Sequence, residues 1–224
     1  MEKLWYLSQI KIFSNLPKED LIKINGVTHM STIPKHTIIQ TPDSSHLGLY
    51  LVKKGKLRIY KLSSSGKQFT IGIIGHGNTF GETSLFSMET KDTYIETIED
   101  TLLCLFKDDD FEAFLVERPK LLINIIKRMD EKINEQNLML EQLANYDIKQ
   151  RLMYWLIKLA NEFGNEEGEI ITIDLALSHQ ELANMIGSTR ESVTSTLNEL
   201  VKEEVIITGR MSIGLRKEML SVFQ

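Results

Sequence analysis

The segment HQELANMIGSTRESVTSTLNEL, residues 179–200, contains side chains that can read DNA bases. The guanidinium of Arg190 can donate two hydrogen bonds to guanine, and the neighbouring Glu191 can accept one from the amine of cytosine. Such side chains reach base edges when they lie in the N-terminal half of a helix that enters the major groove. A carboxylate at this position otherwise repels phosphate, so base reading is a reason for Glu191 to be there.

Two helices joined by a tight turn are predicted for this segment. Ser178 is expected to cap the first helix, with Glu181 as its capping-box partner. Gly187 is expected to end that helix in the left-handed conformation. Ser188 is expected to cap the second helix, again with a glutamate, Glu191, three residues later. The buried stripes of the two helices are predicted to consist of Leu182, Ala183, Ile186, Val193, Leu197 and Leu200.

The flanking segments complete the pattern of a winged helix-turn-helix. NYDIKQRLMYWLIKLANEFGNEEGEI predicts a helix that Gly164 ends before an acidic turn, and IITIDLALS predicts a strand. After the two helices, VIITGRMSIGL predicts a hairpin that turns at Gly209 and Arg210. Residues 146–224 are therefore predicted to form a DNA-binding domain.

A run without glycine or internal proline extends from Pro119 to about Ala144 and predicts a long helix. Its seam residues alternate spacings of four and three over three heptads, as in a coiled coil. The seam residues are Leu122, Ile126, Met129, Ile133, Gln136, Leu140 and Leu143. We interpret residues 119–145 as a dimerisation helix that pairs with its copy. The alternative is a helix that packs on its own domain, since the two patterns overlap.

The first hundred or so residues predict mainly β structure. LGLYLVKKGKLRIYKL predicts two strands around a turn at Lys54 and Gly55, and spaced glycines separate the short apolar stretches that follow. TYIETIEDTLLCLF becomes continuously apolar, as in a strand buried on both faces. Asp110 is expected to cap a short helix that stops near Pro119. Residues 1–118 are thus predicted to be a β-roll (jelly-roll) sensor domain with an N-terminal helix, and the fold class is α+β.

The composition argues against several classes of protein. Of the 224 residues, 42% are hydrophobic and 25% charged, and no apolar run is long enough to span a membrane. The N-terminus has charges within its apolar stretch, so no signal peptide is predicted and a cytoplasmic location is expected. The single Cys104 is expected to be buried, and one thiol cannot supply a zinc or iron–sulfur site. No catalytic pair, metal-ligand cluster or phosphate loop is found, so neither an enzyme nor a cofactor is predicted.

The charge balance provides no overall attraction to nucleic acid. The net charge is −5, and residues 147–224 contain 8 Lys and Arg against 12 Asp and Glu, a net charge of −4. DNA binding must therefore rest on local geometry. Non-specific affinity is expected to be low and strongly dependent on salt.

LSHQELANMIGSTRESVTSTLNEL closely resembles the DNA-reading segment of the CRP/FNR superfamily of bacterial transcription regulators. LYLVKKGKLRIYKLSSSGKQFTIGIIGHGNTFGE is similar to the family's cyclic-nucleotide-type β-roll, and residues 119–144 to its dimerisation helix. The resemblance implies a homodimer on a palindromic double-stranded DNA site, with RNA polymerase as a further partner near the acidic turn EFGNEEGE. It implies phosphate contacts for His179 and Gln180 and base contacts for Arg190 and Glu191. The complete set of candidate DNA-binding residues is His179, Gln180, Ser188, Thr189, Arg190, Glu191, Thr194 and Ser195.

Two departures from the family pattern alter what the resemblance implies. The family motif R-E-x-V-x-R ends in an arginine, and this chain has Ser195 at that position. A weaker or different third base contact is therefore expected. Nucleotide-binding relatives use a Gly-Glu pair and a later Arg-Ser pair to hold the ligand. Here Gly81 and Glu82 are kept, but Asp92 and Thr93 stand in the later places. Because a carboxylate repels a phosphodiester, control by cyclic AMP is not expected.

The identity of the effector, if there is one, is left open. Gly81 and Glu82 can serve the turn itself, through a positive φ and local hydrogen bonds, or can bind an effector. We call Gly81, Glu82, Asp92 and Thr93 the cassette. Gln136 and Asn137 can set the register of the helix pair, or can face an effector pocket together with this cassette. The principal prediction is a DNA-binding transcription regulator of the CRP/FNR type. The alternative is a cyclic-nucleotide-binding regulatory subunit that acts on an enzyme partner.

Overall fold

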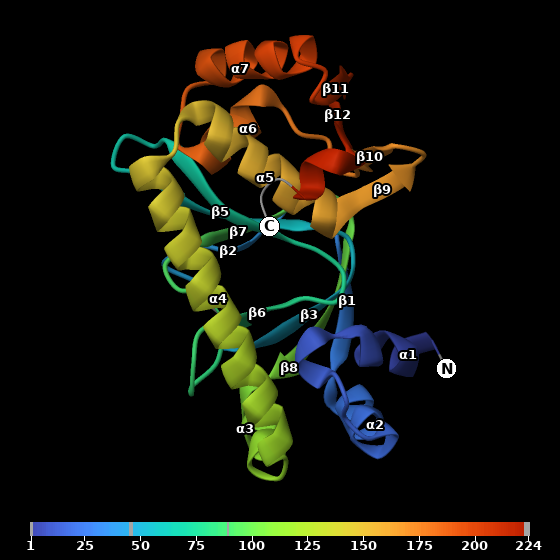
Figure 1. The fold of residues 1–224 in the computed structure, drawn as a ribbon. Helices are drawn as coiled ribbons and strands as arrows, with labels where there is room; N and C mark the ends of the chain where they lie inside the picture. The colour runs from blue at the N-terminus through green and yellow to red at the C-terminus, as the bar shows by residue number, and fades with distance from the viewer. Residues whose placement is uncertain (1, 45–46, 89, 222–224) are drawn as a thin grey trace. The chain divides into compact units, whose positions relative to one another are not determined.

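Two four-stranded antiparallel sheets form the framework of the first half of the chain. The computed structural model describes residues 2–44, 47–88 and 90–221, and the chain divides into a first unit, Met1–Glu135, and a second unit, Gln136–Gln224 (Figure 1). The sheets of the first unit have the strand orders β1-β8-β3-β6 and β2-β7-β4-β5. Their strands are β1 (His29–Ile33), β2 (Ile38–Gln40), β3 (Gly48–Lys54), β4 (Leu57–Leu62), β5 (Gln68–Ile74), β6 (Thr79–Glu82), β7 (Tyr94–Thr97) and β8 (Thr101–Lys107).

The two sheets enclose an apolar core, as the predicted jelly-roll requires. Val52 of β3 and Leu103 of β8 meet Ile59 of β4 and Ile95 of β7 in one buried cluster. On the opposite face of β8, Cys104 and Phe106 belong to a second cluster. The prediction that this strand is buried on both faces is therefore confirmed, as is the burial of the cysteine.

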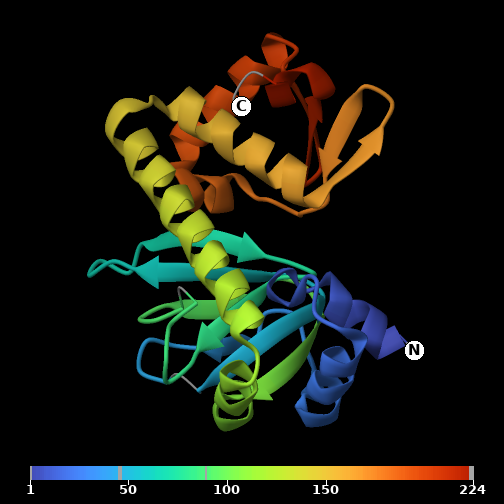
Figure 2. The same ribbon diagram turned by 60° about the horizontal axis from the view of Figure 1, so that its bottom comes forward.

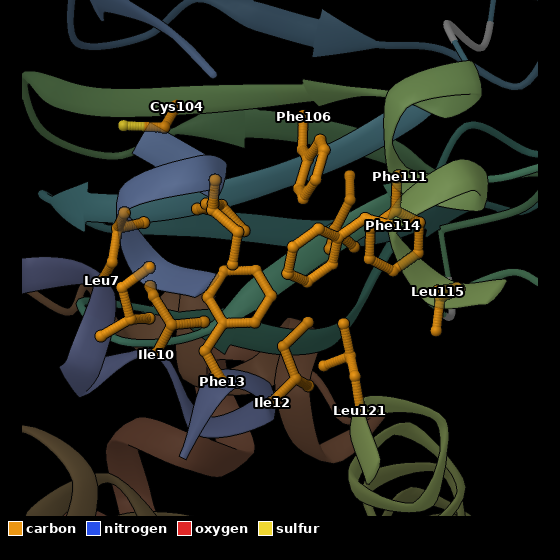
Figure 3. Close-up of a cluster of buried hydrophobic side chains, with 14 of the residues drawn as sticks. Leu7, Ile10, Ile12, Phe13, Cys104, Phe106, Phe111, Phe114, Leu115 and Leu121 are labelled. Atoms are coloured by element: carbon orange, nitrogen blue, oxygen red, sulfur yellow. The ribbon is translucent and has the colours of Figure 1, made fainter. Parts of the chain in front are cut away.

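Short helices cover the outer face of the β8-containing sheet. They are α1 (Glu2–Gln9), the 3-10 helix η1 (Lys11–Phe13), α2 (Lys18–Val27) and α3 (Asp108–Val116). Figure 3 shows side chains from α1, η1, β8, α3 and the start of α4 converging in this cluster, among them the rings of Phe106 and Phe111. Those two rings meet edge to face, with centroids 5.2 Å apart.

Helix α4 (Pro119–Asn145), the long helix in Figure 2, presents two different faces, and the boundary between the two units falls within it. On one face, Leu121 and Ile125 are buried in the cluster of the first unit, and the side-chain amide of Asn124 donates to the carbonyl oxygen of Ile12 at 3.1 Å. On the other face, Ile126 is 57% exposed and Ile133 54%. The apolar residues of the predicted seam are thus not covered by their own chain.

The second unit has the element order of a winged helix-turn-helix. Its elements are α5 (Ile148–Phe163), β9 (Gly164–Glu167), β10 (Ile170–Ile173), α6 (His179–Ile186), α7 (Arg190–Lys202), β11 (Ile206–Gly209), β12 (Ser212–Arg216) and the 3-10 helix η2 (Lys217–Ser221). The strands form one antiparallel sheet in the order β11-β12-β10-β9. A capping box between Asp147 and Gln150 starts α5, and Gly164 ends it. No helix among the described residues is long and apolar enough to cross a membrane.

Several local predictions were wrong. Helix α3 begins at Asp108 rather than after Asp110, since three acidic residues suit the positive end of a helix. The residues predicted as an acidic turn include a strand, β9, which pairs with β10. Two turns lie one residue later than predicted. The turn between β3 and β4, which belong to different sheets, is at Gly55 and Lys56, and the turn of the β11–β12 hairpin is at Arg210 and Met211. The N-terminal region also holds two α-helices where one was predicted.

Candidate DNA-binding site

The sequence between α6 and α7 forms the predicted tight turn. Oγ of Ser178 accepts from the backbone N–H of Glu181 at 3.2 Å, and the Glu181 carboxylate accepts from the backbone N–H of Ser178 at 2.6 Å. Gly187 ends α6 with φ 66° and ψ 37°, a left-handed conformation that glycine adopts without steric cost. The first capping box and the glycine stop are therefore confirmed.

The predicted second capping box does not form. Ser188 is buried, and its backbone N–H donates to the carbonyl oxygen of Ala183, so it belongs to the end of α6. Thr189 caps α7 instead, since its Oγ1 accepts from the backbone N–H of Ser192 at 3.2 Å. Glu191 is thus not used as a capping residue, and the burial of Ser188 argues against the DNA contact predicted for it.

Arg190 and Glu191 are the first two residues of α7, and both are exposed. Ser195 is exposed about one turn further along the helix. The opposite face of α7 is buried through Val193, Leu197 and Leu200, as predicted. Burial of that stripe fixes the rotation of the helix, so its N-terminal half presents the predicted pair to solvent.

Other predicted contact residues form hydrogen bonds, either between α6 and α7 or within one of these helices. Nδ1 of His179, on α6, lies 2.7 Å from Oγ1 of Thr194, on α7. Gln180 donates from its side chain to Oδ1 of Asn184 at 2.9 Å. Because the hydroxyl of Thr194 also donates to the carbonyl oxygen of Arg190, its methyl group is the part best suited to a base contact.

Helix α5 anchors both helices of the motif. Nη1 of Arg151 donates to the carbonyl oxygen of Ile186, the last residue of α6, at 2.9 Å. Nζ of Lys149 donates to the carboxylates of Glu199 and Glu203 on α7, at 2.8 Å and 2.6 Å. These hydrogen bonds raise the pKa of Lys149 above its ordinary value, so the amine stays charged and its links to α7 are retained.

The turn between β11 and β12 adds a candidate DNA contact, Arg210, which was predicted only as a turn residue. Arg210 is exposed there, beside Met211, whose φ is 56°. A cation at the tip of a wing can contact phosphate. The signal available in the sequence was an arginine within a predicted hairpin of the DNA-binding domain.

In the first unit, Gly81 and Glu82 are engaged within the protein. Gly81 has φ 127°, and a Cβ at this position would lie 2.2 Å from the carbonyl oxygen of Gly48 on the neighbouring strand. The carboxylate of Glu82 is buried and accepts hydrogen bonds from Ser87 at 2.8 Å and from Thr90 at 2.6 Å. These contacts support a structural role for the pair.

We expect Gly81→Ala to destabilise the first unit by more than about 2 kcal/mol, because the substitution combines an unfavourable φ with a backbone clash. Gly72→Ala is the matched control, since a Cβ there meets nothing within 4 Å. Hydrogen exchange of amides in β3 and β6, measured by mass spectrometry, reports on the first unit alone. Equal protection of the two variants would contradict this prediction.

The remaining residues of the predicted cassette differ in environment. Asp92 is exposed, with φ 57° in the left-handed region. Thr93 is buried, and its hydroxyl donates to the carbonyl oxygen of Thr90 at 2.7 Å. Gln136 and Asn137 belong to the second unit, so a pocket that joins them to the cassette stays a prediction. Within the described residues, no group of three or more His, Cys, Asp or Glu is arranged to hold a metal ion.

Comparisons with known proteins cover both units. Residues 31–118 match the cyclic nucleotide-binding domain family and residues 150–220 the Crp-like helix-turn-helix domain family. The chain is 31% identical to the "Global nitrogen regulator" of Synechococcus elongatus over 78% of this chain and 77% of that protein. It is also 31% identical to the "Cyclic AMP receptor protein" of Thermus thermophilus, over 77% and 76%. Among solved structures, a CooA mutant from Carboxydothermus hydrogenoformans is similar with a TM-score of 0.72 and 25% identity, over 88% of this chain and 86% of that one.

Proposed function

Because the chain belongs to the CRP/FNR superfamily of transcription regulators, we propose that it acts as a homodimer that binds a palindromic operator. The observation that carries the proposal is the start of α7, where Arg190 and Glu191 are exposed on a helix held by a capped turn. The alternative, a regulatory subunit of an enzyme, has no support among the relatives compared: several are named as regulators, and none of them is named as an enzyme subunit.

The proposed dimer forms through α4. The apolar seam residues lie on the face that the chain leaves exposed, whereas Leu121 and Ile125 are buried within their own unit. Pairing of two such helices would bury this surface as in a coiled coil. A two-fold dimer would present its two recognition helices to successive major grooves, about 34 Å apart.

The first test is selection of binding sites from a random pool of double-stranded DNA, followed by a gel-shift titration. We expect enrichment of a palindrome whose half-sites are centred one helical turn apart. Affinity for the selected site should fall steeply with salt, because phosphate contacts release counterions. A selected pool without a palindrome, or with no preference over random DNA, would contradict the proposal.

We propose that this regulator is not controlled by cyclic AMP. Two features of the cassette support this: Asp92 places a carboxylate where a cation would hold phosphate, and Glu82 already accepts from Ser87 and Thr90. The two 31%-identical relatives carry different regulatory names, so family membership does not assign the effector.

Calorimetric titration with cyclic AMP and cyclic GMP is expected to give dissociation constants weaker than about 1 mM. Asp92→Arg is the informative variant, since it restores a cation without altering Glu82. If wild type binds either nucleotide in the micromolar range, the interpretation of Asp92 is wrong.

We also propose the β9–β10 hairpin as a contact for RNA polymerase. Glu166, Glu167 and Glu169 are exposed on this hairpin, and among the described residues only Glu166 forms an ion pair, with Lys217 at 2.8 Å, so the hairpin keeps a net negative charge. Exposed charge of one sign favours association with a surface of opposite sign.

A further inference from the structure

The hydroxyl of Thr194 determines which nitrogen of His179 carries a proton. Thr194 Oγ1 donates its single hydrogen to the carbonyl oxygen of Arg190 at 2.8 Å, because a carbonyl can only accept. The same oxygen lies 2.7 Å from Nδ1 of His179. With its hydrogen already donated, the hydroxyl accepts in this second contact. Nδ1 therefore carries the proton, and in the neutral ring Nε2 has only a lone pair.

We propose that His179 binds a DNA phosphate through Nε2 only when its imidazole is protonated, so that operator binding takes up a proton. This inference rests on the proposed function. His179 is the first residue of α6, and in a helix-turn-helix the first helix crosses the DNA backbone with its N-terminal N–H groups available to phosphate. A phosphate oxygen is an acceptor, and so is the Nε2 lone pair. The two repel unless a proton lies between them.

Charged groups near this pair lie on both helices of the motif. On α6, Glu181 follows His179 by two residues, and its carboxylate accepts from the backbone N–H of Ser178. On α7, Arg190 and Glu191 lie within one turn before Thr194 and carry opposite charges.

Helix α5, which anchors the two helices of the motif, carries two cations that are bound away from His179. Arg151 donates at the far end of α6, to the carbonyl oxygen of Ile186, and Lys149 is bound to Glu199 and Glu203. Since residues 147–224 have a net charge of −4, one added positive charge per protomer is a substantial change in the attraction to DNA.

The test is to measure the dissociation constant for the selected operator between pH 5.5 and 8.5 at constant ionic strength. In wild type we expect affinity to fall as pH rises, with a limiting slope of about tenfold per pH unit for each proton taken up. As pH rises, the slope of log K, the logarithm of the binding constant, against the logarithm of the salt concentration should also become shallower. The expected change is about 0.9 for each phosphate that the protein no longer neutralises. His179→Arg is expected to bind tightly with little dependence on pH, and His179→Gln to bind more weakly, also with little dependence. His29→Gln, which removes a histidine of the first unit, should retain the wild-type slope.

Variants of Thr194 separate the tautomer from simple packing. Thr194→Val keeps the side-chain shape but removes the hydroxyl, so that the neutral ring can place its proton on Nε2. We expect a smaller pH slope for this variant and a wild-type slope for Thr194→Ser.

Identical slopes in wild type and His179→Gln would overturn the inference while the proposed function stands. Failure of wild type to bind any selected duplex at every pH would overturn the proposed function, and this inference with it.

Discussion

Replacing Arg190 with alanine is expected to weaken binding to the selected operator by between about 30-fold and 10⁴-fold. A bidentate contact from arginine to guanine contributes about 1–3 kcal/mol of discrimination, and a symmetric dimer makes it twice. The position of Arg190 as the first residue of α7, exposed beside the capped turn, is the basis of this expectation. Gel-shift or fluorescence-anisotropy titration with the selected duplex measures the effect.

Two further variants identify the origin of the weaker binding. Arg190→Lys keeps the charge but not the planar fork, so it should retain the salt dependence and show a weaker preference for guanine. Arg216→Ala removes the same charge from β12 of the same unit, where Arg216 pairs with Glu204 at 3.2 Å. That control is expected to leave base preference unchanged. If Arg190→Ala binds the operator and its guanine-substituted versions with wild-type affinities, Arg190 does not read a base.

The sequence was most informative where side chains and backbone make local contacts. The first cap, the glycine stop and the buried stripe of α7 depend on residues within one or two turns of each other, and their spacing predicted them correctly. The second cap was wrong by one residue, because the chain after Gly187 continues the ending of α6 through Ser188 before α7 begins. Two adjacent hydroxyl residues, Ser188 and Thr189, gave the same signal, and the path of the backbone decided between them.

Features that depend on tertiary contacts were less accessible. β9 has residues of low strand propensity, and it forms because β10 offers a partner through its backbone. The bond between His179 and Thr194 joins residues on two helices, and helical periodicity alone places Thr194 only on the outer side. For the cassette, the sequence left a structural and a ligand-binding role open for Glu82. Its contacts with Ser87 and Thr90 now favour the former.

The second large effect is expected from charges placed in the α4 seam. In a paired seam Ile126 and Ile133 of both protomers would be buried. Each is a little over half exposed in the single chain, so its burial on pairing contributes about half of the roughly 1.5–3 kcal/mol expected for a fully exposed side chain. We therefore expect Ile126→Asp/Ile133→Asp to remove about 3–6 kcal/mol of dimer stability and to raise the dimer dissociation constant by more than about 10²-fold. Sedimentation equilibrium measures this directly.

The same double variant should lose operator binding without losing its fold. Both isoleucines are more than half exposed in the single chain, so the charges are tolerated in a monomer. A dimer binds two half-sites at once, because its recognition helices are held at a fixed spacing. Separate protomers bind each half-site independently, so operator affinity falls. Asn134→Asp, an exposed position adjacent to Ile133 but outside the seam, is the matched control and should remain dimeric. A double variant that stays dimeric with full operator affinity would show that this helix is not the dimer interface.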